Sequence, residues 1–356
     1  MKLINYLLIA LVFVSSCKEE DENLPSLSKD YGAGIYIATD NGVSFYKNGV
    51  LISNIFQKVN GFGLNNVNKI KFQGKKAYIA TTKTLFSANV ETFENIGEAS
   101  NFINLVDFDF VSNGRIFAVD RNDAKVKVVD VDLMEIMSDI ETGDSTKPVF
   151  IVSNYSKSFV MNGGSNFEQI KDSTLVVIEH RYNLVSLANF EGSLTVGDNP
   201  NSAVLFTNGE LKVLSQGIYD SINSINNTES SLSVINQYNN EIYSLNTLTG
   251  IYNANNLISD EDICYFTSNN GVYSLSGSGA LVDLNLPRVS DVLCFQNEEY
   301  SIYNPTDSIT TYFNRDVLYI NDSENSKNTV YKYNLDTGLY IDTIVVDAPV
   351  NDIAFY

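Results

Sequence analysis

The chain has no tryptophan, one histidine and three cysteines among its 356 residues. Zinc sites need clusters of cysteine or histidine, and a general base needs a nucleophile and an orienting partner, so this composition argues against both kinds of site. The single histidine, His180, is flanked by Glu179 and Arg181, a context typical of a surface or turn residue. The missing tryptophan also removes the signature of WD repeats.

Motifs for other chemistry are missing as well. The chain contains no phosphate-binding glycine loop and no Gly-x-Ser-x-Gly elbow. Carboxylate pairs such as Asp107 with Asp109 and Asp120 with Asp123 could serve glycoside hydrolysis only if they faced each other across a cleft, and chance pairs are expected in so acidic a chain. We predict a protein that is not an enzyme and needs no cofactor, and calcium bound by loop oxygens stays open as an alternative.

Basic residues are scarce. The chain has 23 lysines and arginines against 43 aspartates and glutamates, which gives a formal charge of −20 at pH 7. Such a surface repels phosphate backbones and anionic lipid headgroups, so we expect no nucleic-acid partner. The acidity by itself suits a soluble surface domain.

Long apolar runs are absent apart from one near the start. Lys2 precedes the apolar run Leu7–Val14, which is the pattern of a secretory signal peptide and is too short to cross a bilayer. The run ends in Val14-Ser15-Ser16-Cys17, which resembles the lipobox of bacterial lipoproteins. This resemblance implies cleavage before Cys17 and lipidation of its sulfur, with a membrane as the site of attachment. An ordinary signal peptide with an incidental cysteine is the alternative.

An acidic segment follows Cys17. Lys18, Glu19, Glu20 and Asp21 resemble the export signal that sends lipoproteins of Bacteroidota-type bacteria to the outside of the outer membrane. A charged tether that only keeps the anchor extended is the alternative. The sequence therefore divides into a signal peptide at 1–16, a lipidated cysteine with its acidic tether at 17–33, and a globular domain at 34–356.

The two remaining cysteines, Cys264 and Cys294, lie in similar apolar contexts. In an oxidising compartment they either form a disulfide or stay as two separately buried thiols, which behave as small apolar side chains. The apolar contexts favour the thiols.

What the sequence has in abundance is short β-rich runs broken by Asn, Asp, Gly and Ser, with no capped helical period. One run recurs along the chain, at Gly34–Thr39, Lys76–Thr81 and Arg115–Asp120, with further echoes at Ser158–Asn162, Ala203–Asn208 and Asp316–Asn321. Its first four aromatic residues, Tyr36, Tyr78, Phe117 and Phe159, recur about every 40 residues, which is the period of a four-stranded propeller blade.

The end of the chain also belongs to this pattern. Val350–Phe355 copies Val67–Phe72, the strand that leads into the repeat at Lys76, whereas the first repeat at Gly34 has no leading strand. We therefore predict an all-β β-propeller of four-stranded blades, closed by the C-terminal strand joining the first blade. The spacing allows six to eight blades and seven fits best, with the boundaries between Asp198 and Tyr312 left open.

Turn motifs carry a further resemblance. Tyr333–Gly338, followed by the β run Ile341–Val346, resembles YVTN and YncE-like bacterial propellers, and is echoed at Asp139–Gly143 and Asn246–Gly250. This resemblance implies the propeller architecture over most of residues 34–356.

Ligands of propellers tend to bind where turns line one end of the central channel. We assign four motifs to the turns between second and third strands: Asp40-Asn41, Arg121-Asn122-Asp123, Tyr238-Asn239 and Ser323-Glu324-Asn325. Arg121, Asn122, Tyr238 and Asn239 are the candidate ligand-binding residues, because a guanidinium fork and a tyrosine ring make strong contacts. Solvated turns without a ligand are the alternative.

Anchor and architecture together resemble surface lipoproteins that capture scarce nutrients such as cobalamin or siderophores for TonB-dependent transporters. The resemblance implies a small-molecule ligand and a transporter partner in the outer membrane. Two alternatives stay open: an accessory subunit of an outer-membrane assembly or secretion complex, which binds protein only, and a propeller lyase or hydrolase.

Overall fold

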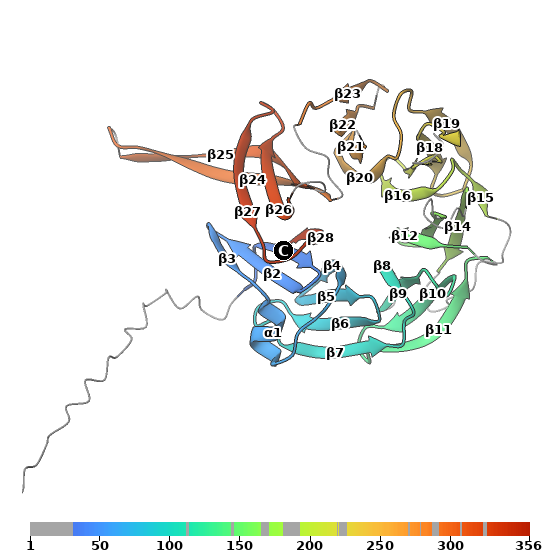
Figure 1. The fold of residues 1–356 in the computed structure, drawn as a ribbon, viewed down its shortest axis with the longest axis horizontal. Coiled ribbons are helices and arrows are strands. Elements are labelled where there is room, and N and C mark those ends of the chain that lie inside the picture. Colours follow the sequence, from blue (N-terminus) through green and yellow to red (C-terminus); the bar gives the residue numbers. More distant parts are fainter. Residues whose placement is uncertain are drawn as a thin grey trace, which may run out of the picture.

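The computed structural model describes residues 31–111, 114–143, 146–164, 171–180, 193–218, 220, 226–269, 271–277, 279–286, 292–306, 308–322 and 326–356. Over these ranges the chain is all-β apart from one short α-helix, α1 (Ile55–Asn60). No helix in this part of the chain is long and apolar enough to span a membrane. The strands form seven antiparallel sheets of four strands each, arranged as blades around a central channel (Figure 1). The prediction of a seven-bladed propeller with very little helix is confirmed.

Blades are numbered along the chain, and their strands run from the channel outward. Blade 1 contains β28 (Val350–Phe355), β1 (Ile35–Thr39), β2 (Gly42–Lys47) and β3 (Val50–Ile52); blade 2 contains β4 (Val67–Gln73), β5 (Lys76–Thr81), β6 (Thr84–Asn89) and β7 (Asn95–Ser100); blade 3 contains β8 (Leu105–Val111), β9 (Arg115–Asp120), β10 (Lys125–Asp130) and β11 (Glu135–Glu141). Blade 4 contains β12 (Pro148–Ser153), β13 (Lys157–Asn162), β14 (Thr174–Glu179) and β15 (Leu194–Thr195); blade 5 contains β16 (Pro200–Leu205), β17 (Glu210–Ser215), β18 (Ser231–Asn236) and β19 (Ile242–Thr247). Blade 6 contains β20 (Asn255–Asp260), β21 (Ile263–Ser268), β22 (Gly271–Leu275) and β23 (Leu281–Asp283); blade 7 contains β24 (Leu293–Asn304), β25 (Ile309–Asp322), β26 (Ser326–Asn334) and β27 (Tyr340–Val345). The first strands of neighbouring blades contact one another around the channel.

The ring is closed by the two ends of the domain. β28 pairs antiparallel with β1, with Ile35 opposite Phe355 and Ile37 opposite Ile353. An apolar cluster that includes Ile353 and Tyr319 joins this blade to blade 7. Because the last strand of the chain is the inner strand of the first blade, it covers an edge of β1 that would otherwise be free to pair with another chain. The predicted closure is confirmed.

The repeated aromatic residues pack between neighbouring blades. Tyr36, Tyr78, Phe117 and Phe159 all lie in second strands and are at most 1 % exposed. The ring of Tyr36 stacks on that of Phe93 from blade 2, with centroids 5.6 Å apart, and its hydroxyl donates to the carbonyl oxygen of Gly32 at 2.7 Å. A buried aromatic ring contributes a large apolar area and retains a polar partner where it carries a hydroxyl. Each repeat therefore supplies part of one interblade core.

One predicted repeat occupies a different strand. Ser158–Asn162 and Asp316–Asn321 lie in the second strands β13 and β25, as expected. Ala203–Leu205 instead belongs to β16, the inner strand of blade 5, and β17 is the second strand of that blade. The prediction for Ala203–Asn208 is wrong, because inner and second strands are both buried between blades and so share the same apolar pattern.

Alternating strand directions give the ring two different faces. We define the upper face as the end with the turns between second and third strands and the links between blades. The lower face is the end with the turns between first and second strands and between third and fourth strands. Every inner strand therefore begins at the upper face.

Cys264 in β21 and Cys294 in β24 are free thiols in different blades. Burial raises the pKa of both, and that of Cys294 reaches about 12. Both groups are therefore protonated at neutral pH and poor nucleophiles. The favoured interpretation, two separate thiols, is confirmed, and the disulfide alternative is wrong.

Candidate ligand-binding site

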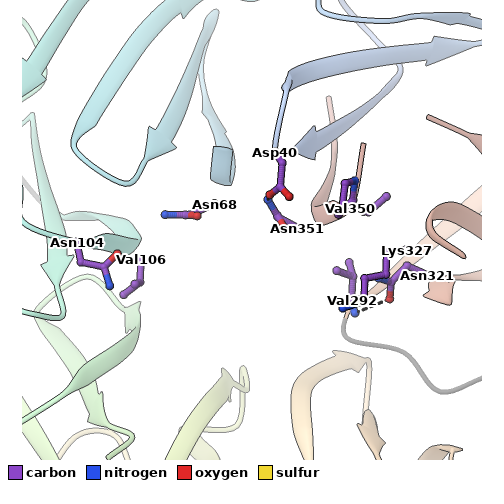
Figure 2. A pocket seen from close by; sticks show the side chains of 10 residues that line it. Asp40, Asn68, Asn104, Val106, Val292, Asn321, Lys327, Val350 and Asn351 are labelled. Carbon is purple, nitrogen blue, oxygen red and sulfur yellow. Dashed lines mark hydrogen bonds between the residues drawn. The ribbon is translucent and has the colours of Figure 1, made fainter. Parts of the chain in front are cut away.

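A cavity of about 540 Å³ lies at the upper mouth of the central channel (Figure 2). It is formed where blades 7, 1, 2 and 3 meet, and it is lined by Asp40, Asn68, Asn104, Val106, Val292, Asn321, Lys327, Pro349, Val350 and Asn351. Its volume is in the range of small-molecule sites in proteins. Four of the ten lining residues are asparagines, so the wall offers both hydrogen-bond donors and acceptors.

β-bulges at the start of the inner strands shape this lining. In blades 1 to 6, the register between the first and second strands shifts within the first few residues of the inner strand. In the first three blades the shift leaves one residue of the inner strand without a partner on the second strand: Asn351 in blade 1, Asn68 in blade 2 and Val106 in blade 3. A bulge turns a side chain away from the regular alternation of the strand. Here it brings three lining residues to the mouth of the channel.

The bulged asparagines also connect neighbouring blades. Asn351 Nδ2 donates to Asp40 Oδ1 at 2.9 Å and to the carbonyl oxygen of Val67 at 3.0 Å. Asn68 Nδ2 donates to the carbonyl oxygen of Leu105 at 2.6 Å. These bonds fix the side chains against the blade edges, and each amide keeps its oxygen as an acceptor for a ligand. The wall is therefore held in place before any ligand arrives.

Opposite charges lie at the rim and further along the channel wall. Asp40, from the β1–β2 turn, and Lys327, from β26, both line the cavity (Figure 2). One residue past the bulge in blade 1, Asp352 Oδ1 is 2.9 Å from Lys69 Nζ of blade 2. Burial alone lowers the pKa of Lys69, but Asp352 and Asp107 outweigh it and raise the pKa above its ordinary value. The channel wall thus carries compensated charges and suits a polar ligand of low net charge.

A second ion pair continues along the wall toward blade 4. Lys71 Nζ is 3.1 Å from Asp107 Oδ1 and 3.9 Å from Asp109 Oδ1, and Asp109 Oδ2 accepts a hydrogen bond from the Ser153 backbone nitrogen at 2.6 Å. Burial raises the pKa of Asp109, and the attraction of Lys71 only partly offsets it. The predicted carboxylate pair Asp107 and Asp109 therefore holds blades 2, 3 and 4 together.

Asp109 makes the stability of the domain depend on pH. A carboxyl group whose pKa is higher in the folded state than in the unfolded chain binds more protons when the chain is folded. The contribution of Asp109 to the free energy of unfolding therefore falls as pH rises above 3.8 toward its folded pKa. We expect Asp109→Asn to remove that decline. Urea unfolding at half-unit steps from pH 4 to pH 7 should give a flatter stability profile for the variant than for the wild type.

Asp132→Asn is the matched control, because the Asp132 side chain is 87 % exposed. Its profile should follow that of the wild type. A profile for Asp109→Asn that falls as steeply as the wild-type one contradicts the assignment.

The structure places two predicted ligand residues on the expected face but outside the cavity. Arg121 and Asn122 lie in the β9–β10 turn of blade 3, which is a second-to-third turn. Arg121 Nη2 donates to the carbonyl oxygen of Gly164 in blade 4 at 3.0 Å, and Asn122 is exposed. Neither residue lines the cavity. Their role in ligand binding stays a prediction, while Asp40 of the first predicted turn does line it.

Tyr238 and Asn239 lie at the opposite end of the molecule. They occupy the β18–β19 turn, between the third and fourth strands of blade 5. The carbonyl oxygen of Tyr238 accepts a hydrogen bond from Lys157 Nζ at 2.6 Å, next to the first-to-second turn of blade 4. The assignment to a second-to-third turn is wrong, and these residues cannot share a site with Arg121.

His180 is buried and is not a surface residue. It follows β14, is 2 % exposed, and meets the ring of Phe117 edge to face with centroids 5.6 Å apart. Burial lowers the pKa of the imidazole, which is therefore neutral at pH 7. The expected surface position is wrong because two charged sequence neighbours do not show which way an intervening side chain points.

The second predicted carboxylate pair, Asp120 and Asp123, makes hydrogen bonds and an ion pair within the fold. Asp120 accepts hydrogen bonds from the backbone nitrogens of Ile103 and Asn104 at 2.8 and 2.7 Å. Asp123 Oδ2 is 2.7 Å from Lys127 Nζ, which holds the pKa of Asp123 below its usual value.

Across the described ranges, no three His, Cys, Asp or Glu side chains gather in a way that could hold a metal ion.

Several predicted residues lie outside the described part of the chain. They are Cys17, Lys18, Glu19, Glu20 and Asp21 at the start, and Ser323, Glu324 and Asn325 between β25 and β26.

Sequence reasoning missed the bulged asparagines. Val67-Asn68 and Val350-Asn351 are visible as a repeat, but the pattern was interpreted as a strand only. The signal was the asparagine that stands at the second position of both strands. Asn104 lies just before β8 and Asn321 near the end of β25, and the sequence did not mark either residue as part of a site.

No family model matches the chain, and no curated protein matches it by sequence. Solved structures are similar in fold at low identity. Hydrazine synthase of Kuenenia stuttgartiensis matches with a TM-score of 0.59 and 12 % identity, over 81 % of this chain and 89 % of that one. The dihydro-heme d1 dehydrogenase NirN in complex with DHE matches with a TM-score of 0.53 and 10 % identity, over 93 % of this chain and 76 % of that one. AztD of Citrobacter koseri matches with a TM-score of 0.53 and 10 % identity, over 88 % of this chain and 82 % of that one. At these identities the likeness shows the propeller fold alone.

Proposed function

We propose that this chain is a surface-exposed outer-membrane lipoprotein of the Bacteroidota type, anchored through Cys17, with no catalytic activity. Its propeller binds a small polar ligand at the upper mouth of the channel and delivers it to a TonB-dependent transporter. The observation that carries the proposal is the cavity lined by asparagines from neighbouring blades, because amide groups held in fixed positions recognise polar ligands without reacting with them.

The path of the chain supports an outward-facing cavity. The backbone nitrogens of Tyr31 and Gly32 donate to the carbonyl oxygens of Glu91 and Val90, in the third-to-fourth turn of blade 2. The segment that leads back to Cys17 therefore leaves from the lower face. An anchor attached at this face leaves the upper mouth open for a ligand to enter.

The segment after Cys17 sets the side of the membrane on which the domain lies. Replacing Lys18, Glu19, Glu20 and Asp21 with neutral residues is expected to keep the protein membrane-bound but leave it inside the cell envelope. Protease added to whole cells should then no longer digest the propeller, whereas it should digest the wild type.

Neutral replacement of Asp40, an acidic residue at the rim of the cavity, serves as the control, and it should leave digestion unchanged. If the variant with the neutral segment is still digested on intact cells, Lys18–Asp21 do not direct export.

A further inference from the structure

The first hairpin of blade 7 extends well beyond its sheet. β26 pairs with β25 only from Val317 onward, whereas β24 and β25 remain paired out to Asn304 opposite Ile309. We call this two-stranded extension, Asn297–Asn304 with Ile309–Asp316, the arm. Figure 1 shows it reaching away from the ring without a neighbouring strand on either edge. An isolated two-stranded ribbon is only marginally stable in water, so such an extension needs a partner surface.

The arm has one apolar and one polar side. Cross-strand partners share a side, and Tyr300 lies opposite Phe313 with their rings stacked at a centroid distance of 5.5 Å. Ile302 and Ile309 follow on the same side toward the tip, where they are 54 % and 56 % exposed and lie opposite Thr311 and Asn304. The other side carries Glu299, Ser301, Tyr303, Thr310, Tyr312 and Asn314. The apolar side therefore has the pattern of a buried surface but faces solvent.

The base of the arm is fixed to blade 7. Glu298 accepts a hydrogen bond from the Tyr319 hydroxyl and lies 3.1 Å from Arg315 Nη2 and 2.8 Å from Lys332 Nζ. The Arg315 guanidinium also covers the Tyr300 ring at 4.9 Å. This network sets the direction in which the arm leaves the ring.

Charge is almost absent from the outer part of the arm. Between Tyr300 and Phe313 the sequence has one charged residue, Asp307, and no lysine or arginine, in a chain of net charge −20. Tyrosine is enriched at the membrane–water interface, and phenylalanine is typical of the apolar face of segments that lie in it. A surface contact based on apolar burial suits this composition better than one based on charge.

The arm leaves the ring on the same face as the segment that leads to Cys17. The arm extends a turn between a first and a second strand, so it starts at the lower face, where Tyr31 and Gly32 are also bound, and Figure 1 shows it running outward beside the ring. Exposed apolar residues of the ring itself also gather in lower-face turns, at Leu133, Tyr155 and Leu339, which are 66 to 77 % exposed. Apolar side chains are thus exposed at the end of the ring from which the arm starts.

The lengths of the two extensions are compatible with one membrane surface. Tyr31 follows Cys17 by about 14 residues, which span at most roughly 50 Å when fully extended. The eight residues of each arm strand span roughly 26 Å. The tether therefore allows the arm to touch the membrane while the ring stays clear of it.

We propose that the arm is a second membrane contact, which places the side chains of Tyr300, Ile302, Ile309 and Phe313 in the headgroup region of the bilayer. The inference rests on the lipid anchor of the proposed function. It adds a second point of attachment, which limits how the anchored propeller can turn relative to the membrane.

The lack of tryptophan allows a direct test. The full acylated chain carrying Phe313→Trp, a substitution at a 42 % exposed position, is incorporated into phosphatidylcholine vesicles with and without brominated acyl chains. We expect the indole emission to shift to shorter wavelength in vesicles and to lose intensity with brominated lipid. The control is Tyr243→Trp on the outer strand of blade 5, which should show neither change.

The possible failures are distinguishable. Mass spectrometry of the N-terminal peptide reports acylation, so a chain without acyl groups contradicts the anchor. An acylated, vesicle-bound chain whose F313W emission is unshifted and unquenched overturns the arm proposal alone. Emission that is already shifted in vesicle-free detergent solution and depends on protein concentration shows that a second copy covers the arm, which also overturns it.

Discussion

Replacing Cys17 with alanine is expected to move the protein from the membrane fraction to the soluble fraction. Each buried acyl methylene contributes about 0.8 kcal/mol to membrane binding, so losing several acyl chains removes nearly all of it. The arm by itself offers only a few apolar side chains and should give weak, reversible binding that washing removes. Fractionation of cells followed by detection of the tagged chain measures the effect.

Cys294→Ala is the matched control for this experiment. Cys294 is a partly buried thiol in blade 7 that has no part in the proposed anchor. The C294A chain should stay in the membrane fraction as the wild type does. Retention of the C17A chain in washed membranes would mean that another element attaches the protein.

Replacing Ile353 with aspartate is expected to destabilise the whole ring. Ile353 is 4 % exposed and lies in the cluster that joins β28 to blade 7, opposite Ile37 of β1. Loss of its apolar burial and burial of an unpaired carboxylate together cost about 3–5 kcal/mol. This should lower the melting temperature by roughly 10 °C, measured by circular dichroism.

Two controls separate ring closure from general effects of the substitution. Ile353→Val should cost only about 1 kcal/mol, because it keeps an apolar side chain at the site. Ile242→Asp makes the same change in the outer strand of blade 5, where the side chain is 37 % exposed, and should have a small effect. Equal losses for I353D and I242D would contradict the view that β28 closes the ring.

The sequence predicted the architecture because the repeat is physically simple. In each of the first four blades an aromatic residue of the second strand packs between blades, so Tyr36, Tyr78 and Phe117 recur with the blade period. The copied strand at Val350–Phe355 predicted the closure for the same reason. The same pattern gave a wrong prediction at Ala203–Leu205, because an inner strand buried between blades has the apolar pattern of a second strand.

The same ambiguity explains why the ligand site was only partly predicted. Successive turns of a blade alternate between the two faces, so placing a turn one strand too early moves it to the other end of the molecule. This happened to Tyr238, which lies on the lower face. Asp40 was placed correctly because the first blade was well defined. Asn351 and Asn68 were visible as a repeated asparagine, but their place at the channel mouth depends on the bulges in β28 and β4, which form only when these strands pair with β1 and β5.

Copurification from gently solubilised outer membranes tests the central claim most directly, with mass spectrometry of both the proteins and the small molecules recovered. The tagged wild type is compared with Asn104→Trp, which fills the cavity at a partly buried position on its wall. The account predicts that both chains recover a TonB-dependent transporter and that only the wild type carries the small molecule. Recovery of assembly or secretion machinery, with no small molecule on either chain, would contradict it.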